Sequence, residues 1–246
     1  MVIDAHNHLG GPDKGDGRSQ DTSEILAAMD KAGVEMAVVF PFNEAEPGIS
    51  FSRTNDYIAA SVKSHPDRLI GFCRLDPNCG PAALHELERC INVLGLRGVK
   101  LHPTSQGFSL TDPTLARILG LAESFGIPAV FDTGKKESPP LGVATLAREF
   151  PGLTIIMAHM NLYDESLDAA RTAPNIYIGT TGYFNPPRLA KAVGELGAGR
   201  FIMGSDSPYI RMEREVEKIN RLEGVGADEK KLIQGGNAAR ILGIRL

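Results

Sequence analysis

The chain has 246 residues, a formal net charge of -4 and hydrophobic residues at 42% of its positions. The slight acidic excess and the dispersed Lys and Arg argue against nucleic acid or an anionic membrane as the main partner. No apolar run approaches the length of a membrane-spanning helix. No linker or low-complexity tract divides the chain, so we expect a single domain over residues 1–246.

The N-terminal segment and the cysteines indicate the compartment. The chain begins with a charged strand and lacks the basic and apolar regions of a signal peptide. Cys73, Cys79 and Cys90 form an odd set without C-x-x-C spacing, which is typical of a reducing environment. We therefore expect a cytoplasmic protein.

Strand-like and helix-like patterns alternate along the whole chain. Short runs rich in Val, Ile and Phe predict strands over residues 2–6, 35–40, 69–75, 96–101, 127–131, 153–158, 175–179 and 200–204. Amphipathic patterns predict helices over residues 23–31, 55–64, 82–93, 115–124, 141–149, 165–171, 187–195 and 213–222, with a last helix over 238–242. Strict alternation predicts a parallel sheet, and eight units predict an α/β fold of the closed (β/α)8 or TIM barrel type.

The alternative fold is an open, doubly wound sheet with a phosphate-binding glycine turn. The segment from Gly10 to Gly15 has the first spacing of such a turn, but Asp16 follows where Lys is required. The closed barrel is therefore favoured.

Metal-competent side chains follow the predicted strands. His6 and His8 lie two residues apart on the first strand, so both point to the same face. Later strands end at four further residues of this kind, namely His102, Asp132, His159 and Asp206. A parallel barrel builds its active site at the carboxyl ends of its strands, and closure places the eighth strand beside the first. We therefore expect Asp206 beside His6 and His8.

Two imidazoles and a carboxylate are suitable ligands for a catalytic divalent metal ion. Asp132 or His159 could complete the set around His6, His8 and Asp206. Zn²⁺ bound in this way lowers the pKa of its water to about 7 and makes hydroxide available at neutral pH. We expect one divalent ion, with Zn²⁺ favoured over Mn²⁺ and Fe²⁺.

The chain resembles the amidohydrolase superfamily, specifically its amidohydrolase-2 group, over essentially its whole length. The motifs that carry the resemblance are Asp4-Ala5-His6-Asn7-His8, Gly98-Val99-Lys100-Leu101-His102-Pro103, Met157-Ala158-His159-Met160, Gly204-Ser205-Asp206-Ser207-Pro208 and the closing run from Gly235 to Gly243. The resemblance implies a distorted barrel in which His6, His8 and Asp206 bind the metal. It also implies that Asp206 transfers a proton from the metal-bound water and that His159 assists catalysis or binds the metal.

One position departs from the family pattern. Members usually carry a histidine in a run like His-Thr-Gly at the end of the fifth strand, whereas this chain reads Phe131-Asp132-Thr133-Gly134. Asp132 is predicted as a metal ligand, and a position behind the ligands is left open. A carboxylate ligand shifts the preference toward Mn²⁺ or Fe²⁺.

Substrate contacts are expected from His102, Lys100 and Tyr183. Lys100 and His102 share a face of the fourth strand, and the resemblance leaves open a carboxylated Lys100 bridging two metals, although a second metal is not favoured. Tyr183 lies in a loop that follows a strand, where barrel enzymes bind substrates. Other loop residues that could contact a carboxylated or aromatic substrate are Lys135, Lys136, Asn161, Phe184 and Arg188.

We therefore predict a metal-dependent hydrolase that cleaves an amide, lactone or related ester bond in a small molecule. In this hypothesis Asp206 accepts the proton of the metal-activated water. The alternative within the family is a metal-dependent decarboxylase of an aromatic or unsaturated acid, and a non-catalytic metal-binding protein is the remote alternative. Assembly into a homo-oligomer is left open.

Overall fold

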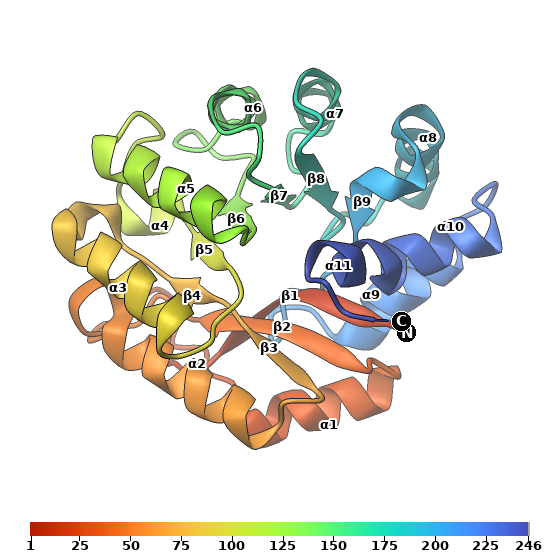
Figure 1. The fold of residues 1–246 in the computed structure, drawn as a ribbon. Coiled ribbons are helices and arrows are strands. Elements are labelled where there is room, and N and C mark those ends of the chain that lie inside the picture. Colours follow the sequence, from red (N-terminus) through yellow and green to blue (C-terminus); the bar gives the residue numbers. More distant parts are fainter. Residues whose placement is uncertain (246) are drawn as a thin grey trace.

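Parallel strands form a ring enclosed by helices in the computed structural model, which describes residues 1–245 (Figure 1). The strands are β1 (Ile3–Leu9), β2 (Met36–Pro41), β3 (Leu69–Gly71), β4 (Cys73–Arg74), β5 (Val99–Leu101), β6 (Ala129–Asp132), β7 (Ile155–Ala158), β8 (Ile176–Gly179) and β9 (Phe201–Ile202). Every pair of neighbouring strands is parallel. The predicted α/β barrel is confirmed.

The predicted helices are present, each within three residues of its predicted bounds. They are α1 (Thr22–Ala32), α2 (Ser52–Ser64), α3 (Pro81–Asn92), α5 (Pro113–Phe125), α6 (Pro140–Glu149), α7 (Tyr163–Thr172), α8 (Pro186–Leu196), α9 (Met212–Asn220) and α11 (Asn237–Ile241). The structure adds the short helices α4 (Pro103–Gln106) and α10 (Ala227–Lys231), and a π-helical turn, η4 (Leu232–Gly236). Among residues 1–245, no helix is both long and apolar enough to cross a bilayer.

Local capping explains where two of the helices begin. The Asp21 carboxylate accepts the backbone N–H of Glu24, and the Glu24 side chain accepts the backbone N–H of Asp21, which forms a capping box at the start of α1. Asp112 accepts the N–H groups of Thr114 and Leu115 at the start of α5. Both helices therefore begin where their sequence satisfies free backbone donors.

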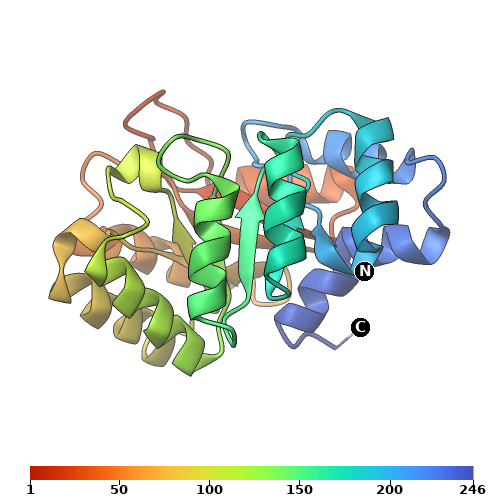
Figure 2. The ribbon, with the colours of Figure 1, turned by 90° about the horizontal axis from the view of Figure 1, so that it is seen from above.

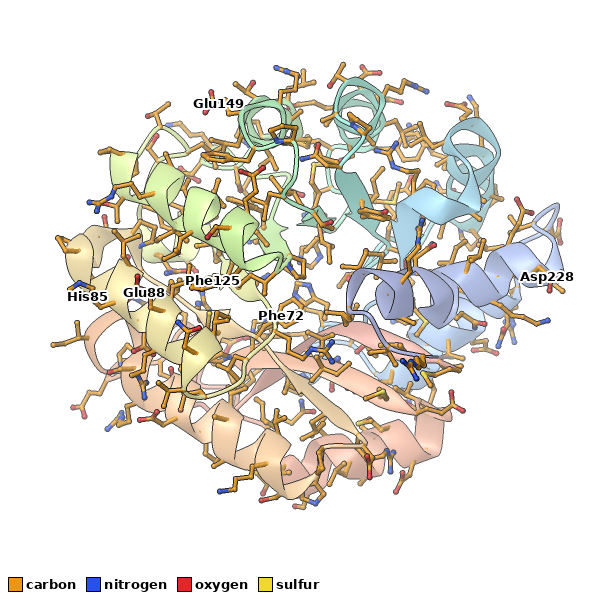
Figure 3. The ribbon with its side chains drawn as sticks, viewed as in Figure 1. Phe72, His85, Glu88, Phe125, Glu149 and Asp228 are labelled. Carbon is orange, nitrogen blue, oxygen red and sulfur yellow. The ribbon has the colours of Figure 1, made fainter. Side chains whose placement is uncertain are left out.

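One predicted strand, 69–75, is divided at Phe72. The first half, β3, pairs with β2, whereas the second half, β4, pairs with β5. The Phe72 ring packs on Gly98, where a Cβ atom would lie 2.4 Å from the ring. Figure 3 shows Phe72 within the ring of strands, whereas His85 and Glu88 lie on the outer helix α3. The Phe72 ring thus packs closely on Gly98 at the point where the chain changes its partner strand.

Hydrogen bonds between the first and the last strand region close the barrel. Ala5 N donates to Met203 O, His8 N donates to Ser207 O, and Asp206 N donates to His6 O at 2.7 Å. Figures 1 and 2 show the two ends of the chain close together. This closure brings the residues after β9 alongside β1.

The apolar core has two parts. The larger part lies between strands and helices, and the smaller part fills the barrel with Ile3, Ala5, Val38, Phe40, Ile70, Phe72, Val130, Ile156, Ala158 and Ile202. Ala238, Ala239 and Leu242, from α11 and the residue that follows it, pack against this inner cluster. The barrel is therefore packed inside, and the polar residues of the site lie beyond this apolar filling.

Candidate active site

An irregularity in β1 directs two histidines into the barrel. Ile3 and Ala5 face the inner core, and simple alternation would turn the even-numbered residues outward. The register of β1 against β2 shifts between Asp4 and Asn7, so His6 and His8 point inward while Leu9 packs on the outer core. A bulge of this kind re-aims side chains next to active sites. His6 and His8 therefore share a face because of their spacing, and the bulge turns that face inward.

Two further site residues lie just beyond strand ends in a left-handed backbone conformation. His159 follows β7 with φ 69°, and Asp206 follows β9 with φ 64°. Residues other than glycine rarely adopt positive φ, and such strain often marks functional sites. The turn directs both side chains toward His6 and His8.

The four side chains converge. The Asp206 Oδ1 atom lies 3.3 Å from His6 Nε2 and 3.1 Å from His8 Nε2. Donor atoms of His6, His159 and Asp206 all lie within 4.8 Å of one another. Two ligands about 2.1 Å from one ion are themselves separated by about 3.0–3.4 Å, so these spacings fit a divalent metal ion.

The protonation states also suit metal binding. Burial lowers the pKa of His6 to about 3, with a further contribution from the charge of Lys100, and burial also lowers the pKa of His8. Both rings are therefore neutral at pH 7, the state in which imidazole binds metals. Burial acts to raise the pKa of Asp206, but hydrogen bonds from His6 and His8 hold it below its usual value.

A second polar cluster surrounds Asp132. The Asp132 Oδ2 atom lies 3.3 Å from both His102 Nε2 and His159 Nε2, and Lys135 Nζ lies 2.9 Å from Oδ1. Burial acts to raise the pKa of Asp132, but the hydrogen bond from His159 and the neighbouring positive charges hold it well below 3.8. Asp132 is thus a carboxylate placed behind His159 rather than between His6 and His8.

Hydrogen bonds define the tautomer of His102. Its Nδ1 accepts the backbone N–H of Ser105 at 3.2 Å, so in the neutral ring the proton is on Nε2 and points to Asp132. Burial lowers the pKa of His102 to about 2, so the ring is neutral.

His159 is oriented by a backbone carbonyl. Its Nδ1 lies 3.2 Å from Thr181 O, and a carbonyl oxygen only accepts, so Nδ1 carries a proton. The other nitrogen, Nε2, lies between Asp132 and the group formed by His6 and Asp206. A lone pair on Nε2 would face the Asp132 carboxylate, so a proton or a cation is favoured between the two atoms.

A cavity of about 300 Å³ opens onto both clusters. Its lining combines predicted residues with several that sequence reasoning did not single out, and the full set is His8, Asp13, Asn43, Arg74, His102, Ser105, Asp132, Lys135, His159, Asn161, Asp206 and Tyr209. Arg74 is the last residue of β4 and lies inside the predicted strand 69–75, whereas His102 and Asp132 follow their predicted strands.

Two predicted substrate contacts lie elsewhere. Lys100 is fully buried with its Nζ 3.3 Å from His6 Nε2, and burial lowers its pKa to about 8. Tyr183 stacks on Tyr163 with ring centroids 5.6 Å apart. Neither residue is among those that line the cavity, so the geometry gives no support to a direct substrate contact by either.

Comparison with curated proteins identifies relatives that are decarboxylases. A γ-resorcylate decarboxylase from Polaromonas sp. strain JS666 is 25% identical over 281 residues, which cover 87% of this chain and 84% of that protein. A 2-amino-3-carboxymuconate-6-semialdehyde decarboxylase from Dictyostelium discoideum is 40% identical over 77 residues, but this match spans only 21% of that protein's length.

Solved structures share the fold over nearly the full chain. A 5-carboxyvanillate decarboxylase from Sphingomonas paucimobilis superposes with a TM-score of 0.79 at 21% identity and covers 99% of both chains. A dihydroxybenzoic acid decarboxylase from Polaromonas sp. JS666, solved with manganese and the inhibitor 2-nitroresorcinol, has a TM-score of 0.77 at 18% identity, over 100% of this chain and 98% of that one.

These findings correct the predicted activity. Hydrolysis of an amide, lactone or ester is wrong as the main prediction, because the similar proteins are decarboxylases, which agrees with the alternative. The resemblance to the family itself is confirmed, because the family model described as Amidohydrolase matches residues 3–244. The chain belongs to the amidohydrolase family.

Proposed function

We propose that this protein is a metal-dependent decarboxylase of a small aromatic carboxylic acid. The observation that carries the proposal is the convergence of His6, His8 and Asp206 beside the Asp132–His159 pair at one cavity. A volume of about 300 Å³ suits a ligand with one ring. The decarboxylase relatives support this reaction over hydrolysis.

We assign the metal to His6, His8 and Asp206. Two neutral imidazole nitrogens and one carboxylate oxygen accept Mn²⁺, Fe²⁺ or Zn²⁺. Manganese is bound in the similar dihydroxybenzoic acid decarboxylase, so we favour Mn²⁺ over the zinc expected from the sequence. When bound, such an ion supplies positive charge that attracts the oxygens of an acidic substrate.

The chain's own residues supply the proton that decarboxylation requires. The bond from the ring carbon to the carboxylate breaks, CO₂ leaves, and the ring carbon takes a proton in its place. We assign this proton to His159 Nε2, because Thr181 O holds Nδ1–H and the Asp132 carboxylate stabilises a proton on the other nitrogen. In this proposal Asp132, predicted as a ligand, acts on His159 instead.

The first experiment measures CO₂ release by the Mn²⁺-loaded protein. The substrates are 2,6-dihydroxybenzoate and a panel of carboxylated phenols that includes 5-carboxyvanillate. We expect CO₂ and the corresponding decarboxylated phenol in equal amounts. Metal-loaded protein that releases no CO₂ from any member of the panel would overturn the proposal.

A variant tests the proton donor. The His159→Asn variant should keep its metal but lose activity by about 100-fold or more, which is the usual scale of general acid catalysis. His85 is an exposed histidine on α3, and His85→Asn is the matched control that should behave as wild type. Normal turnover by His159→Asn would remove His159 from proton transfer.

A further inference from the structure

Arg74, at the end of β4, is a buried cation on the cavity wall. The residue is 1% exposed and lines the same cavity as Asp206. Its Nε donates to Gln106 Oε1 at 3.3 Å, its Nη1 donates to Pro41 O at 3.2 Å, and its Nη2 donates to Ser105 Oγ at 2.9 Å. These three acceptors are neutral, and they hold the guanidinium in a fixed orientation.

The guanidinium lacks a carboxylate partner. Within the part of the chain that the structure describes, no Asp or Glu oxygen lies within 4.0 Å of Arg74. Asp13 also lines the cavity and acts on Arg74 through its charge, but its two oxygens accept the N–H groups of Gly15 and Asn43. A guanidinium has five N–H donors, and only three are used. Buried cations are normally paired, so the Arg74 guanidinium can still bind an anion that is not part of the protein.

The charges around the cavity support the same conclusion. Three cations, namely Arg74, Lys135 and the adjacent Lys100, are balanced by the three carboxylates Asp13, Asp132 and Asp206. A divalent metal ion therefore leaves a net positive charge. This charge favours an anionic substrate, and each further carboxylate of the substrate adds to the attraction toward the cations of the cavity wall.

We propose that Arg74 binds a second carboxylate of the substrate, so that the preferred substrate is a dicarboxylic acid whose other carboxylate leaves as CO₂. The fate of the leaving carboxylate rests on the proposed function, whereas the second anionic subsite can be measured without turnover. A planar guanidinium with free N–H groups suits a carboxylate in particular, because two parallel hydrogen bonds can form.

The test compares two unreactive probes. Calorimetry on the Mn²⁺-loaded wild-type protein measures the affinities of isophthalate, which has two carboxylates on one ring, and of benzoate, which has one. We expect isophthalate to bind about 10-fold more tightly or better, as a charge-assisted hydrogen bond contributes on this scale. In Arg74→Met this preference should disappear while benzoate affinity changes by less than about 3-fold.

Controls separate the subsite from general electrostatics. Arg53 is an exposed arginine on α2, and Arg53→Met should keep the wild-type preference. Arg74→Lys keeps the charge but loses the planar fork, so it should keep part of the preference for isophthalate. This variant provides the test if Arg74→Met fails to fold. A preference that survives in Arg74→Met, or that is lost in Lys135→Met alone, would overturn the assignment to Arg74.

Two outcomes distinguish this inference from the proposed function. If wild type binds isophthalate no better than benzoate, or binds 2,6-dihydroxybenzoate better than isophthalate, the dicarboxylate subsite is wrong even when CO₂ is released. If the isophthalate preference depends on Arg74 but no acid is decarboxylated, the subsite stands and the proposed reaction fails.

Discussion

Asp206 and His159 combine an unfavourable backbone conformation with the chemistry of the site. Each has a positive φ, which costs about 1–2 kcal/mol for a residue with a Cβ atom. Asn and Asp tolerate this conformation better than most residues, because their short polar side chains hydrogen-bond locally. At position 206, the native Asp and the similar Asn are therefore the side chains that this backbone conformation strains least.

The Asp206→Asn variant should fold as stably as wild type and lose activity. The amide keeps the left-handed turn but is a weaker ligand and lacks the carboxylate charge, so we expect Mn²⁺ affinity to fall and CO₂ release to drop by about 100-fold or more. Thermal unfolding, metal analysis and turnover are measured in parallel. Wild-type Mn²⁺ affinity together with wild-type turnover would contradict the assignment of Asp206 as a ligand.

Residue types determine how much of the site could be predicted from the sequence. His6, His8, His159 and Asp206 could be found because metal-competent residues at strand ends have a specific meaning. Arg74 lies inside a predicted strand rather than after one, and its proposed role depends on the lack of a carboxylate partner among the described residues, which only the structure reveals. The neighbours that line the cavity through loops, such as Asn43 and Ser105, depend on loop conformation and have no signal in the sequence.

At the scale of elements, helix α9 holds the segment that orients His159. Glu215 and Lys218 on α9 form a buried ion pair. Lys218 Nζ donates to Thr180 O at 2.6 Å, and Glu215 Oε1 accepts the N–H of Gly182 at 3.3 Å. Thr181, between these two contacts, offers the carbonyl that receives His159 Nδ1–H. The pair therefore acts on the site through the backbone of residues 180–182.

Replacing the Glu215–Lys218 pair should reduce turnover strongly and the stability of the fold only moderately. In the double variant Glu215→Gln/Lys218→Met neither member of the pair is left as an unpaired buried charge, so the loss of stability should be moderate. Because supporting residues of metal sites typically contribute about 10 to 100-fold in affinity or activity, we expect a loss of turnover in this range. Lys191→Met on the surface of α8 is the control, since its Nζ is exposed. Unchanged turnover in the double variant would show that the pair is not a positioning element.

The same pair predicts how stability depends on pH. Burial raises the pKa of Glu215 from 4.5 to about 7, while the charge of Lys218 opposes this shift. A raised pKa in the folded state means that the folded protein binds this proton more tightly than the unfolded chain does. The stabilising contribution is therefore complete below pH 4.5 and is lost as the pH rises through 7.

We accordingly expect wild type to lose more stability between pH 5 and pH 8 than Glu215→Gln does. Urea unfolding of chelator-treated protein at both pH values measures this difference without a contribution from bound metal. Asp4, whose pKa burial raises to about 6, contributes with the same sign in both proteins, and its charge is one of the causes that raise the pKa of Glu215. An equal or larger loss in Glu215→Gln would contradict the prediction.

The order and type of the elements could be predicted because barrel strands are short apolar runs and outer helices are amphipathic. The change of partner strand at Phe72 could not be predicted, because it depends on the packing of the Phe72 ring against Gly98. The π-helical turn η4 was also missed. Its Gly235 packs against the backbone at Met1, where a Cβ atom would lie 2.4 Å from Met1 O, and this contact joins opposite ends of the chain.

At the scale of the whole molecule, a buried polar network joins the first strand to the last. Asn7 Nδ2 donates to Asp4 O and to Val38 O, and Asn7 Oδ1 accepts the hydroxyl of Ser205 at 2.9 Å. Asn7 is fully buried, so water cannot replace these hydrogen bonds if its side chain is removed. The network holds Asp206 beside His6 through the adjacent residues.

Asn7→Ala should destabilise the whole barrel. Several buried polar groups would lose their partner, and each unsatisfied group costs about 1–3 kcal/mol, so we expect a loss of about 2–4 kcal/mol in the free energy of unfolding. Asn78→Ala, at an exposed asparagine, is the matched control and should cost less than about 1 kcal/mol. Equal losses in urea unfolding of the two variants would contradict a special role of Asn7 in closure.

Barrel closure also sets the time at which the proposed metal site can form during biosynthesis. His6 and His8 leave the ribosome before Asp206, which follows two hundred positions after His6. At 5–20 residues per second, this interval is roughly 10–40 s. A nascent chain therefore presents two imidazoles without their carboxylate, and the proposed ligand set is complete only after Asp206 has been made. Metal loading at the proposed site therefore follows the synthesis of Asp206, and protein made under metal starvation should become active when the ion is supplied afterwards.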